Sequence, residues 1–440
     1  MPLKRSLNLF DATLLVVGNV VGAGVFTTAG FLAGELESPL LFIGVWVIGG
    51  LLTLCGALTY AEMSGMFPHS GGDYLFLKAA YGPWAGFLLG WVSFWIINPG
   101  SIAVLSIAVV KYLKGFIDFT SIFNEKITAL GIILFFTLLN YRGVRLSAKA
   151  QNLCILGSIA IILILIAGGL LSGKGNWQNF NNNGLESVSF SKLFGSSMIA
   201  VIFSYSGWFV TAYIGDEVKK PERNLPLSLF SGTMIVMVMY MLLNIVYLYA
   251  IPISSLKGVI NVGQLVGERL FNPYFTQVVS GAIILAIAAS INATILAGAR
   301  IPYAMAEDKL IWAPLKRVHP EYDTPHIGLL FQMGLACLFV IVETFEHLLS
   351  YVVFIMLLSS IGSGIAHLIL RWKMPLLPRP YRTWGYPYVP LLFVLLYMWI
   401  AGQVAFSNPG TSILGIAITL SGIPFYFYAL SRKDNIKLAS

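Results

Sequence analysis

Charged side chains are scarce in this sequence of 440 residues. Only 10% of the residues are Asp, Glu, Lys or Arg, whereas 57% are hydrophobic; soluble proteins carry about 25% charged residues. Cysteine is also rare, and Cys55, Cys154 and Cys337 all lie in apolar segments, which indicates small packed residues rather than disulfides. The composition therefore excludes an ordinary soluble protein and predicts a chain embedded in a membrane.

The residue patterns of metal sites and nucleotide-driven enzymes are missing as well. Neither HExxH nor GxxxxGK[ST] occurs. The five histidines are scattered along the chain: His69, His319, His326, His347 and His367. We therefore expect no enzyme, no metal site and no cofactor beyond an ion that could couple to transport.

Long apolar segments recur along the whole chain, and about 20 apolar residues cross a bilayer as a helix. Twelve such segments are predicted, at about residues 8–35, 39–67, 83–112, 123–141, 147–172, 193–217, 225–250, 274–306, 326–343, 346–372, 387–406 and 411–431. The connections between them are short. We expect one all-α integral membrane domain over residues 1–440, with twelve transmembrane helices.

The basic residues are distributed unevenly between the two predicted sides. If the N-terminus lies inside, 20 of the 27 Lys and Arg residues fall on the cytoplasmic side. This bias predicts a multi-pass protein of the cell membrane with both termini in the cytoplasm. It also accounts for the net charge of +8 without a nucleic-acid partner.

Two predicted helices are interrupted by glycine. The first contains GNVVGAGVF, with Gly18, Gly22 and Gly24, although a glycine costs about 1 kcal/mol relative to alanine within a helix. Close helix packing through small residues is one explanation. A second interruption, FSYSGW at Phe203–Trp208, lies five segments later. Such a pair favours two halves of inverted topology and a transporter site near the middle of the bilayer.

Each interruption exposes the ends of two helical pieces. Free N–H groups at a helix start suit a carboxylate, and free carbonyl groups suit an ammonium group. The sequence places no charged residue deep in a predicted span, so the two breaks would bind a zwitterion without a charged side chain. Glu62 is either paired near a cytoplasmic gate or solvated at a helix end.

The first glycine motif and five others resemble one family. Besides GNVVGAGVF they are YAEMSGMFPHSGGDYLFLKAAYG at Tyr60–Gly82, NYRGVRLSAKAQN at Asn140–Asn152, FSYSGWFVTAYIGDEVKKPERNLP at Phe203–Pro226, SINATILAGARIPYAMAEDKL at Ser290–Leu310 and RPYRTWGYPYVP at Arg379–Pro390. The chain resembles amino acid–polyamine–organocation (APC) superfamily transporters, in particular the L-amino acid transporter and arginine/agmatine exchanger branches.

The resemblance implies a LeuT-type fold of five plus five helices in inverted repeat. Repeat one would cover about 8–172 and repeat two about 193–372, followed by two additional helices over about 387–431. Helices 1 and 6 would be the interrupted ones.

The resemblance also implies a substrate site. The main-chain amides that would hold the substrate carboxylate are those of Ala23, Gly24 and Val25. The carbonyl groups that would hold the amino group are those of Val20, Val21, Phe203, Ser204 and Ser206. The Phe203 ring would also close over the substrate as a gate, and Trp208 would bound the pocket.

Further residues have two interpretations each. Asn98 either faces the substrate side chain, as in the arginine/agmatine exchangers, or caps a kink beside Pro99. Ser359 and Ser360 are possible lining residues. Many relatives carry a Lys on helix 5 at the place of Ser158. The absence of this Lys leaves Na⁺ or H⁺ coupling open, and Ser290 and Thr294 are available as ligands of Na⁺. The alternative is simple exchange or facilitated uptake.

We therefore expect secondary transport or exchange of amino acids by alternating access, most of all small neutral L-amino acids. A cationic amino acid or polyamine exchanger of the same fold is the alternative, and a non-transporting amino acid sensor is an alternative of another class. No cysteine lies between Lys114 and Lys126, so we expect no disulfide-linked heavy chain. The protein would act as a monomer or homodimer.

Overall fold

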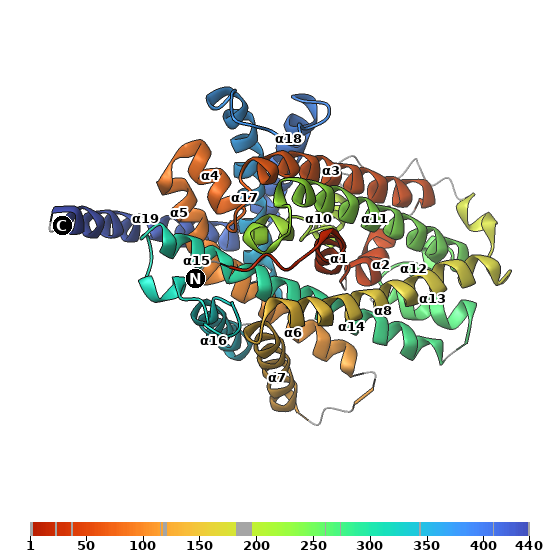
Figure 1. Ribbon diagram of the computed structural model, residues 1–440. Coiled ribbons are helices and arrows are strands. Elements are labelled where there is room, and N and C mark those ends of the chain that lie inside the picture. The colour runs from red at the N-terminus through yellow and green to blue at the C-terminus, as the bar shows by residue number, and fades with distance from the viewer. Residues whose placement is uncertain are drawn as a thin grey trace.

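The computed structural model describes residues 3–438 except residues 23, 37, 115, 118–120, 182–195, 260, 273, 343–344 and 408. Across these residues the chain is helical, apart from its connections and one isolated bridge between Leu7 and Val218. Most helices run roughly side by side along the length of the molecule (Figure 1).

The elements of the first half are α1 (Leu9–Val20), α2 (Gly24–Leu36), α3 (Pro39–Met66), α4 (Asp73–Tyr81), α5 (Pro83–Val92), η1 (Ser93–Ile97), α6 (Asn98–Leu113), α7 (Ile122–Tyr141), α8 (Val144–Leu171), η2 (Trp177–Phe180), α10 (Ser196–Ser204) and η4 (Val210–Glu217). Those of the second half are α11 (Pro221–Ala250), α12 (Ile253–Leu256), α13 (Val262–Leu270), α14 (Phe275–Gly298), α15 (Arg300–Glu307), η5 (Ala313–Lys316), α16 (His326–Val342), α17 (Phe345–Lys373), α18 (Tyr388–Ser407) and α19 (Pro409–Leu438).

Nine helices in the described parts of the chain are long and apolar enough to cross a membrane. They coincide with nine of the twelve predicted segments, which confirms a multi-pass helical membrane protein. The other three differ for identifiable reasons. The first and sixth segments are each divided into two pieces, and α16 has 17 residues, somewhat fewer than the roughly 20 that a bilayer core requires.

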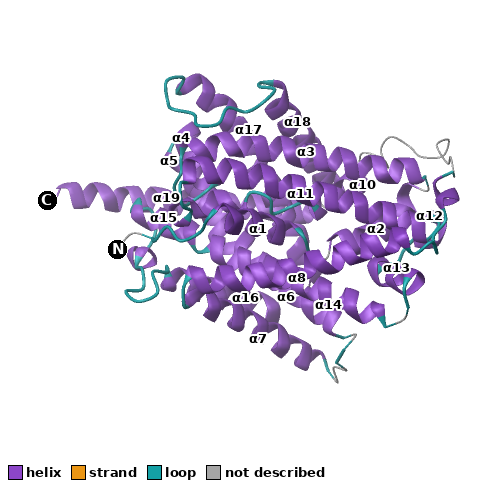
Figure 2. Cartoon of the chain, turned by 45° about the vertical axis from the view of Figure 1, so that its right-hand side comes forward, coloured by secondary structure: helices purple, strands orange, loops and turns teal. Residues whose placement is uncertain are grey.

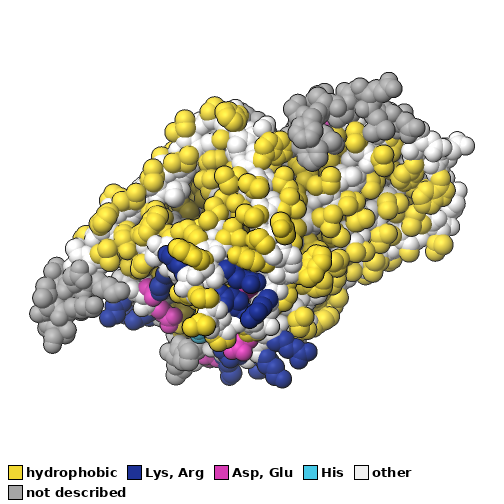
Figure 3. Space-filling model, turned by 90° about the horizontal axis from the view of Figure 1, so that it is seen from above, with side chains coloured by type: hydrophobic (Ala, Val, Ile, Leu, Met, Phe, Trp, Pro, Cys, Tyr) yellow, Lys and Arg dark blue, Asp and Glu magenta, His cyan; other side chains and the backbone are white. Residues whose placement is uncertain are grey.

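The side chains on the surface agree with a location in a membrane. Large apolar side chains such as Leu153 (76% exposed) and Phe406 (86% exposed) face outward. On the face drawn in Figure 3, Lys and Arg side chains gather in one region and hydrophobic side chains cover most of the remainder. The chain begins and ends at the same end of the molecule, which we call the terminal end (Figures 1 and 2).

Helix α1 lies at the centre, in contact with α8, α11 and α14. It is apolar and buried almost all round, as expected of a helix enclosed by other helices. Gly232 of α11 allows the close approach, because a Cβ atom there would lie only 2.6 Å from the Cβ of Val16. Around this centre α3 packs along α11, and α8 packs along α14.

A π-helical turn, η1, joins α5 to α6 and inserts one extra residue into the helical spiral. The turn precedes Pro99, which has no N–H group to donate to the preceding helical turn. This local irregularity sets the direction of Asn98, whose Cβ lies near Gly298 of α14.

Candidate functional site

The first predicted transmembrane segment, here called helix 1, is interrupted at the predicted glycine motif. α1 ends at Val20, and Val21 is extended, with φ −71° and ψ 98°, while its N–H donates to the Val17 carbonyl at 2.8 Å. The chain resumes a helix, α2, at Gly24. Ala23 lies outside the described residues.

The sixth predicted transmembrane segment, here called helix 6, is interrupted as well. α10 ends at Ser204, a turn follows over residues 205–209, and η4 begins at Val210. Gly207 has φ +96°, a left-handed conformation that favours glycine. The Ser206 N–H donates to the Phe203 carbonyl at 3.0 Å. The sequence thus located both breaks.

The two breaks contact each other directly. A Cβ atom at Gly24 would lie 2.9 Å from both the Cα and the Oγ of Ser204, so the start of α2 packs against the end of α10. The side-chain amide of Asn19 donates to the Gly207 carbonyl at 2.8 Å and accepts from the Thr294 hydroxyl at 3.3 Å. Asn19 therefore joins α1, the helix 6 break and α14.

Several carbonyl groups predicted to bind an amino group already accept hydrogen bonds within the protein. The buried Tyr240 hydroxyl of α11 reaches the carbonyls of Val20, at 2.9 Å, and Ser204, at 3.3 Å. Phe203 accepts from Ser206 as described. A carbonyl oxygen has two lone pairs, so each of these groups keeps the capacity for a second donor.

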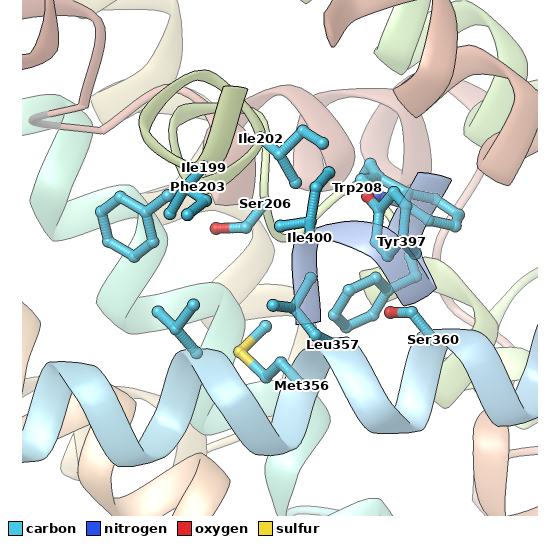
Figure 4. A pocket seen from close by; sticks show the side chains of 12 residues that line it. Ile199, Ile202, Phe203, Ser206, Trp208, Met356, Leu357, Ser360, Tyr397 and Ile400 are labelled. Carbon is cyan, nitrogen blue, oxygen red and sulfur yellow. The ribbon is translucent and has the colours of Figure 1, made fainter. Parts of the chain in front are cut away.

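A first cavity lies beside the helix 6 break, between α10, α17 and α18 (Figure 4). Three predicted residues line it together: Phe203, Ser206 and Trp208. Met356 and Leu357 of α17 face them from the other side (Figure 4). Its remaining walls are mostly apolar, with Ser360, another of the predicted lining residues, among them. The arrangement suits an uncharged, compact side chain.

A second cavity lies on the other side of the same turn and is much more polar. Residues with hydroxyl, amide or carboxyl groups on its wall are Asn19, Asp73, Ser93, Asn98, Ser101, Tyr213, Thr294 and Ser359. The Asn98 Nδ2 atom is buried and finds no hydrogen-bond partner within the described part of the protein. An unpaired buried amide is costly, so this donor is available to a ligand. The two cavities share Phe209 and Met356.

The expectation that no acidic side chain lines the site is wrong, because Asp73 is part of the wall of the second cavity. The first residue of α4, it is buried and accepts hydrogen bonds from Tyr213 (2.7 Å), Ser359 (2.8 Å) and Ser363 (2.7 Å). Burial raises the pKa of its carboxyl group, and the hydroxyl donors oppose that rise. The sequence signal was the carboxylate following Gly71 and Gly72, but nothing local in the chain indicated its distant partners.

Two of the three residues considered for ion coupling lie together, and the third bonds elsewhere. Ser290 and Thr294 lie one turn apart on α14, and the Ser290 hydroxyl donates to the Gly18 carbonyl at 2.8 Å. Ser158 instead donates to the Ala282 carbonyl at 3.1 Å. Ala282 precedes Ser290 by eight residues, about 12 Å along the helix. Groups of three or more His, Cys, Asp or Glu side chains placed to hold a metal are not found among the described residues.

Charged residues gather toward the terminal end. Glu217, at the end of η4, forms a completely buried ion pair with Arg300, and its carbonyl accepts from the N–H groups of Ser6 and Leu7. This pair therefore lies where the chain enters α1. It did not stand out in the sequence because both residues lie at the ends of predicted helices.

Glu62 is paired rather than solvated. Its carboxylate accepts from Arg371 at 2.7 Å, Arg379 at 2.9 Å and the Thr383 N–H at 2.7 Å, and it contacts His367 at 3.1 Å. The cluster ties α3 to α17 and to the loop before α18.

Comparison with known proteins agrees with this architecture. The family model described as "Amino acid permease" matches residues 7–428. The serine/threonine exchanger SteT of Bacillus subtilis is 29% identical over 437 residues, covering 98% of this chain and 98% of its own. The human large neutral amino acids transporter small subunit 2 is 27% identical, covering 100% of this chain and 83% of its own.

The human Asc-type amino acid transporter 1 is also 27% identical, covering 99% of this chain and 84% of its own. These similarities extend over the interrupted helices and both cavities. The chain belongs to the amino acid permease family within the APC superfamily, and is a membrane transporter rather than an enzyme.

Proposed function

We propose that this protein exchanges small neutral L-amino acids across the cell membrane by alternating access around the two helix breaks. The observation that carries the proposal is the contact between the breaks, made by Asn19 and Gly207 and by Gly24 and Ser204. Interrupted helices that meet beside polar cavities are the arrangement by which transporters bind small zwitterions.

In the proposed site, main-chain groups bind the carboxylate and the amino group of the substrate, and protein side chains contact the rest of it. Amides at Ala23, Gly24 and Val25 hold the carboxylate, and carbonyls at Val20, Val21, Phe203, Ser204 and Ser206 hold the amino group. The Asn98 amide, unpaired among the described residues, donates to a polar substrate side chain, for instance a hydroxyl group. Phe203 gates the site, and Trp208 bounds it.

The name of the bacterial relative gives serine and threonine as what it exchanges. A hydroxyl side chain suits the second cavity, whose wall carries amides and hydroxyl groups. A cationic substrate is the second candidate, because the Asp73 carboxylate is part of the same wall.

The proposed topology has twelve membrane spans in two inverted repeats of five, plus α18 and α19. The broken first and sixth segments and α16 supply the three spans beyond the nine long helices. Both termini are proposed to be cytoplasmic, and their location at one end of the molecule supports an even number of spans (Figure 1). We also propose that the protein works without a disulfide-linked partner, as a monomer or homodimer. Its three cysteines are free and lie within helices.

The test is exchange by the purified protein in liposomes. Vesicles loaded with unlabelled serine, leucine or arginine, or left empty, would be supplied with labelled amino acids, with and without Na⁺ and a pH gradient. We expect rapid uptake of small neutral amino acids that requires an internal amino acid. Exchange of arginine alone would favour the cationic alternative, and binding without flux of any amino acid would favour a sensor.

A matched pair of phenylalanine variants places the site. Phe203→Ala removes a ring from the cavity wall, so we expect a fall in exchange of about tenfold or more. Phe123→Ala removes a ring that is 71% exposed on α7 and is expected to leave exchange unchanged. Equal activity in both variants would contradict the proposed position of the site.

A further inference from the structure

A separate cavity opens at the terminal end, away from the helix breaks. Three segments form it: the start of the chain, the turn between α7 and α8, and the loop before α16. It has a volume of about 910 Å³ including its open mouth. Its charged lining residues are Lys4, Arg142, Arg145, Lys149, Glu321 and Asp323.

The walls of this cavity are held in place by specific contacts. The Thr324 hydroxyl donates to the Tyr141 carbonyl at 3.0 Å, which fixes the loop before α16 against the end of α7. The rings of His319 and Tyr322 stack at 4.5 Å within that loop. Gly143 reverses the chain between α7 and α8 with φ +124°, a conformation that strains other residues. The cavity is thus a formed site rather than a gap between loose segments.

Its charge favours an anion. Four cationic side chains face two carboxylates, which leaves an excess of two positive charges. The one ion pair among them, Lys4 to Asp323, is 4.0 Å long and its lysine is 68% exposed, so it is weak. Basic pockets between helices at a membrane surface bind phosphate headgroups of lipids.

Exposed apolar side chains beside the cationic ones favour a lipid over a soluble phosphate as the ligand. On α8, Lys149 lies three residues after Leu146 and four before Leu153, so the three side chains share one face of the helix. The leucines are 42% and 76% exposed, and Leu153 lies about 6 Å farther along the helix than Lys149. Arg142, the residue directly after α7, follows the 48% exposed Leu138 by four residues.

We propose that this cavity binds the headgroup of an anionic phospholipid. The phosphate lies between Arg145, Lys149 and Arg142, and one acyl chain runs along Leu146 and Leu153. A long lysine side chain reaches such a headgroup while its methylene groups cover apolar surface. The bound lipid would join the α7–α8 turn to the first residues of the chain, just before α1 begins.

The experiment compares lipids and variants by thermal stability in detergent and by native mass spectrometry. The full-length protein would be mixed with phosphatidylglycerol, phosphatidylcholine, sn-glycerol 3-phosphate or inorganic phosphate. The test variant is Arg145→Gln/Lys149→Gln. The control is Lys220→Gln/Arg382→Gln, which removes the same charge from exposed residues outside the cavity.

We expect phosphatidylglycerol to raise the melting temperature and to remain bound to the wild type and the control. In the test variant its apparent affinity should fall about tenfold or more. Equal stabilisation by phosphatidylglycerol and phosphatidylcholine would overturn the proposal, as would equal lipid retention by the test and control variants. Binding of sn-glycerol 3-phosphate or inorganic phosphate as strong as that of the lipid would show a soluble-phosphate site instead.

Discussion

Asn19 is the side chain through which the two helix breaks depend on each other. Its amide donates to the Gly207 carbonyl at 2.8 Å, and both residues lie at the turns where regular helical hydrogen bonding stops. Asn19→Ala removes the shorter of two hydrogen bonds to that carbonyl and leaves the longer one, which the Val210 N–H donates at 3.3 Å. Loss of one such hydrogen bond costs about 0.5–1.5 kcal/mol, which corresponds to roughly a 2- to 13-fold change in an equilibrium constant.

The matched control is Thr294→Val. It removes the longer, 3.3 Å bond to the other end of the same amide, together with the 2.8 Å bond from the same hydroxyl to the Ser290 carbonyl, and leaves the bond between Asn19 and Gly207 intact. We expect exchange in liposomes to fall about twofold or more in Asn19→Ala and by clearly less in Thr294→Val. The melting temperature should follow the same order. Exchange in Asn19→Ala within twofold of the wild type would refute the argument that this bond organises the site.

Three further predictions use the same reasoning. Tyr240→Phe removes a donor that competes with the substrate ammonium group for the Val20 carbonyl, so we expect a saturating amino acid to raise the melting temperature of this variant more than that of the wild type; a smaller rise than in the wild type would contradict the proposed ammonium site. Glu217→Gln leaves Arg300 buried without its counterion, which costs about 3–5 kcal/mol, and the melting temperature should drop sharply and recover in part in Glu217→Leu/Arg300→Met. Because burial raises the pKa of Asp73, its ionisation costs stability as the pH rises from about 4, and Asp73→Asn should show a smaller loss of melting temperature between pH 4.5 and 7.5 than the wild type.

The sequence predicted the elements well because their signals are local. A run of about 20 apolar residues is visible without knowledge of its neighbours, and in the described parts of the chain nine such runs form helices long enough to cross a membrane. The breaks at Gly22–Gly24 and Tyr205–Gly207 were likewise visible, because glycine in a membrane helix requires an explanation. Here the explanation is the close approach of Gly24 to Ser204 and the left-handed turn at Gly207.

The hydrogen-bond partners of polar residues could not be predicted from the sequence, because they depend on packing between distant segments. Asp73 binds hydroxyl groups 286 and 290 residues away. Asn19 is part of the first motif, but its role could not be inferred without the position of Gly207, which is 188 residues away. Ser158 was matched to the Lys of many relatives by its place along helix 5. Its bond to Ala282 depends on how α8 packs against α14, which no motif encodes.

Under the proposed alternating access, the terminal end is the side where opening is expensive. Glu217 and Arg300 are fully buried there, and the Glu217 carbonyl also holds the first residues of the chain. Separating such a pair without another partner costs about 3–5 kcal/mol. A ligand must bind one state about 5.5 kcal/mol more tightly than the other to reverse a 1:99 population.

The two costs are of the same order, so a substrate that bridges both breaks can supply most of what opening requires, provided water or a rearranged carboxylate solvates the separated charges. A substrate that engages only one break cannot. If opening separates the buried pair, the empty carrier would lack the binding energy to return, and this would give a physical reason for the proposed exchange.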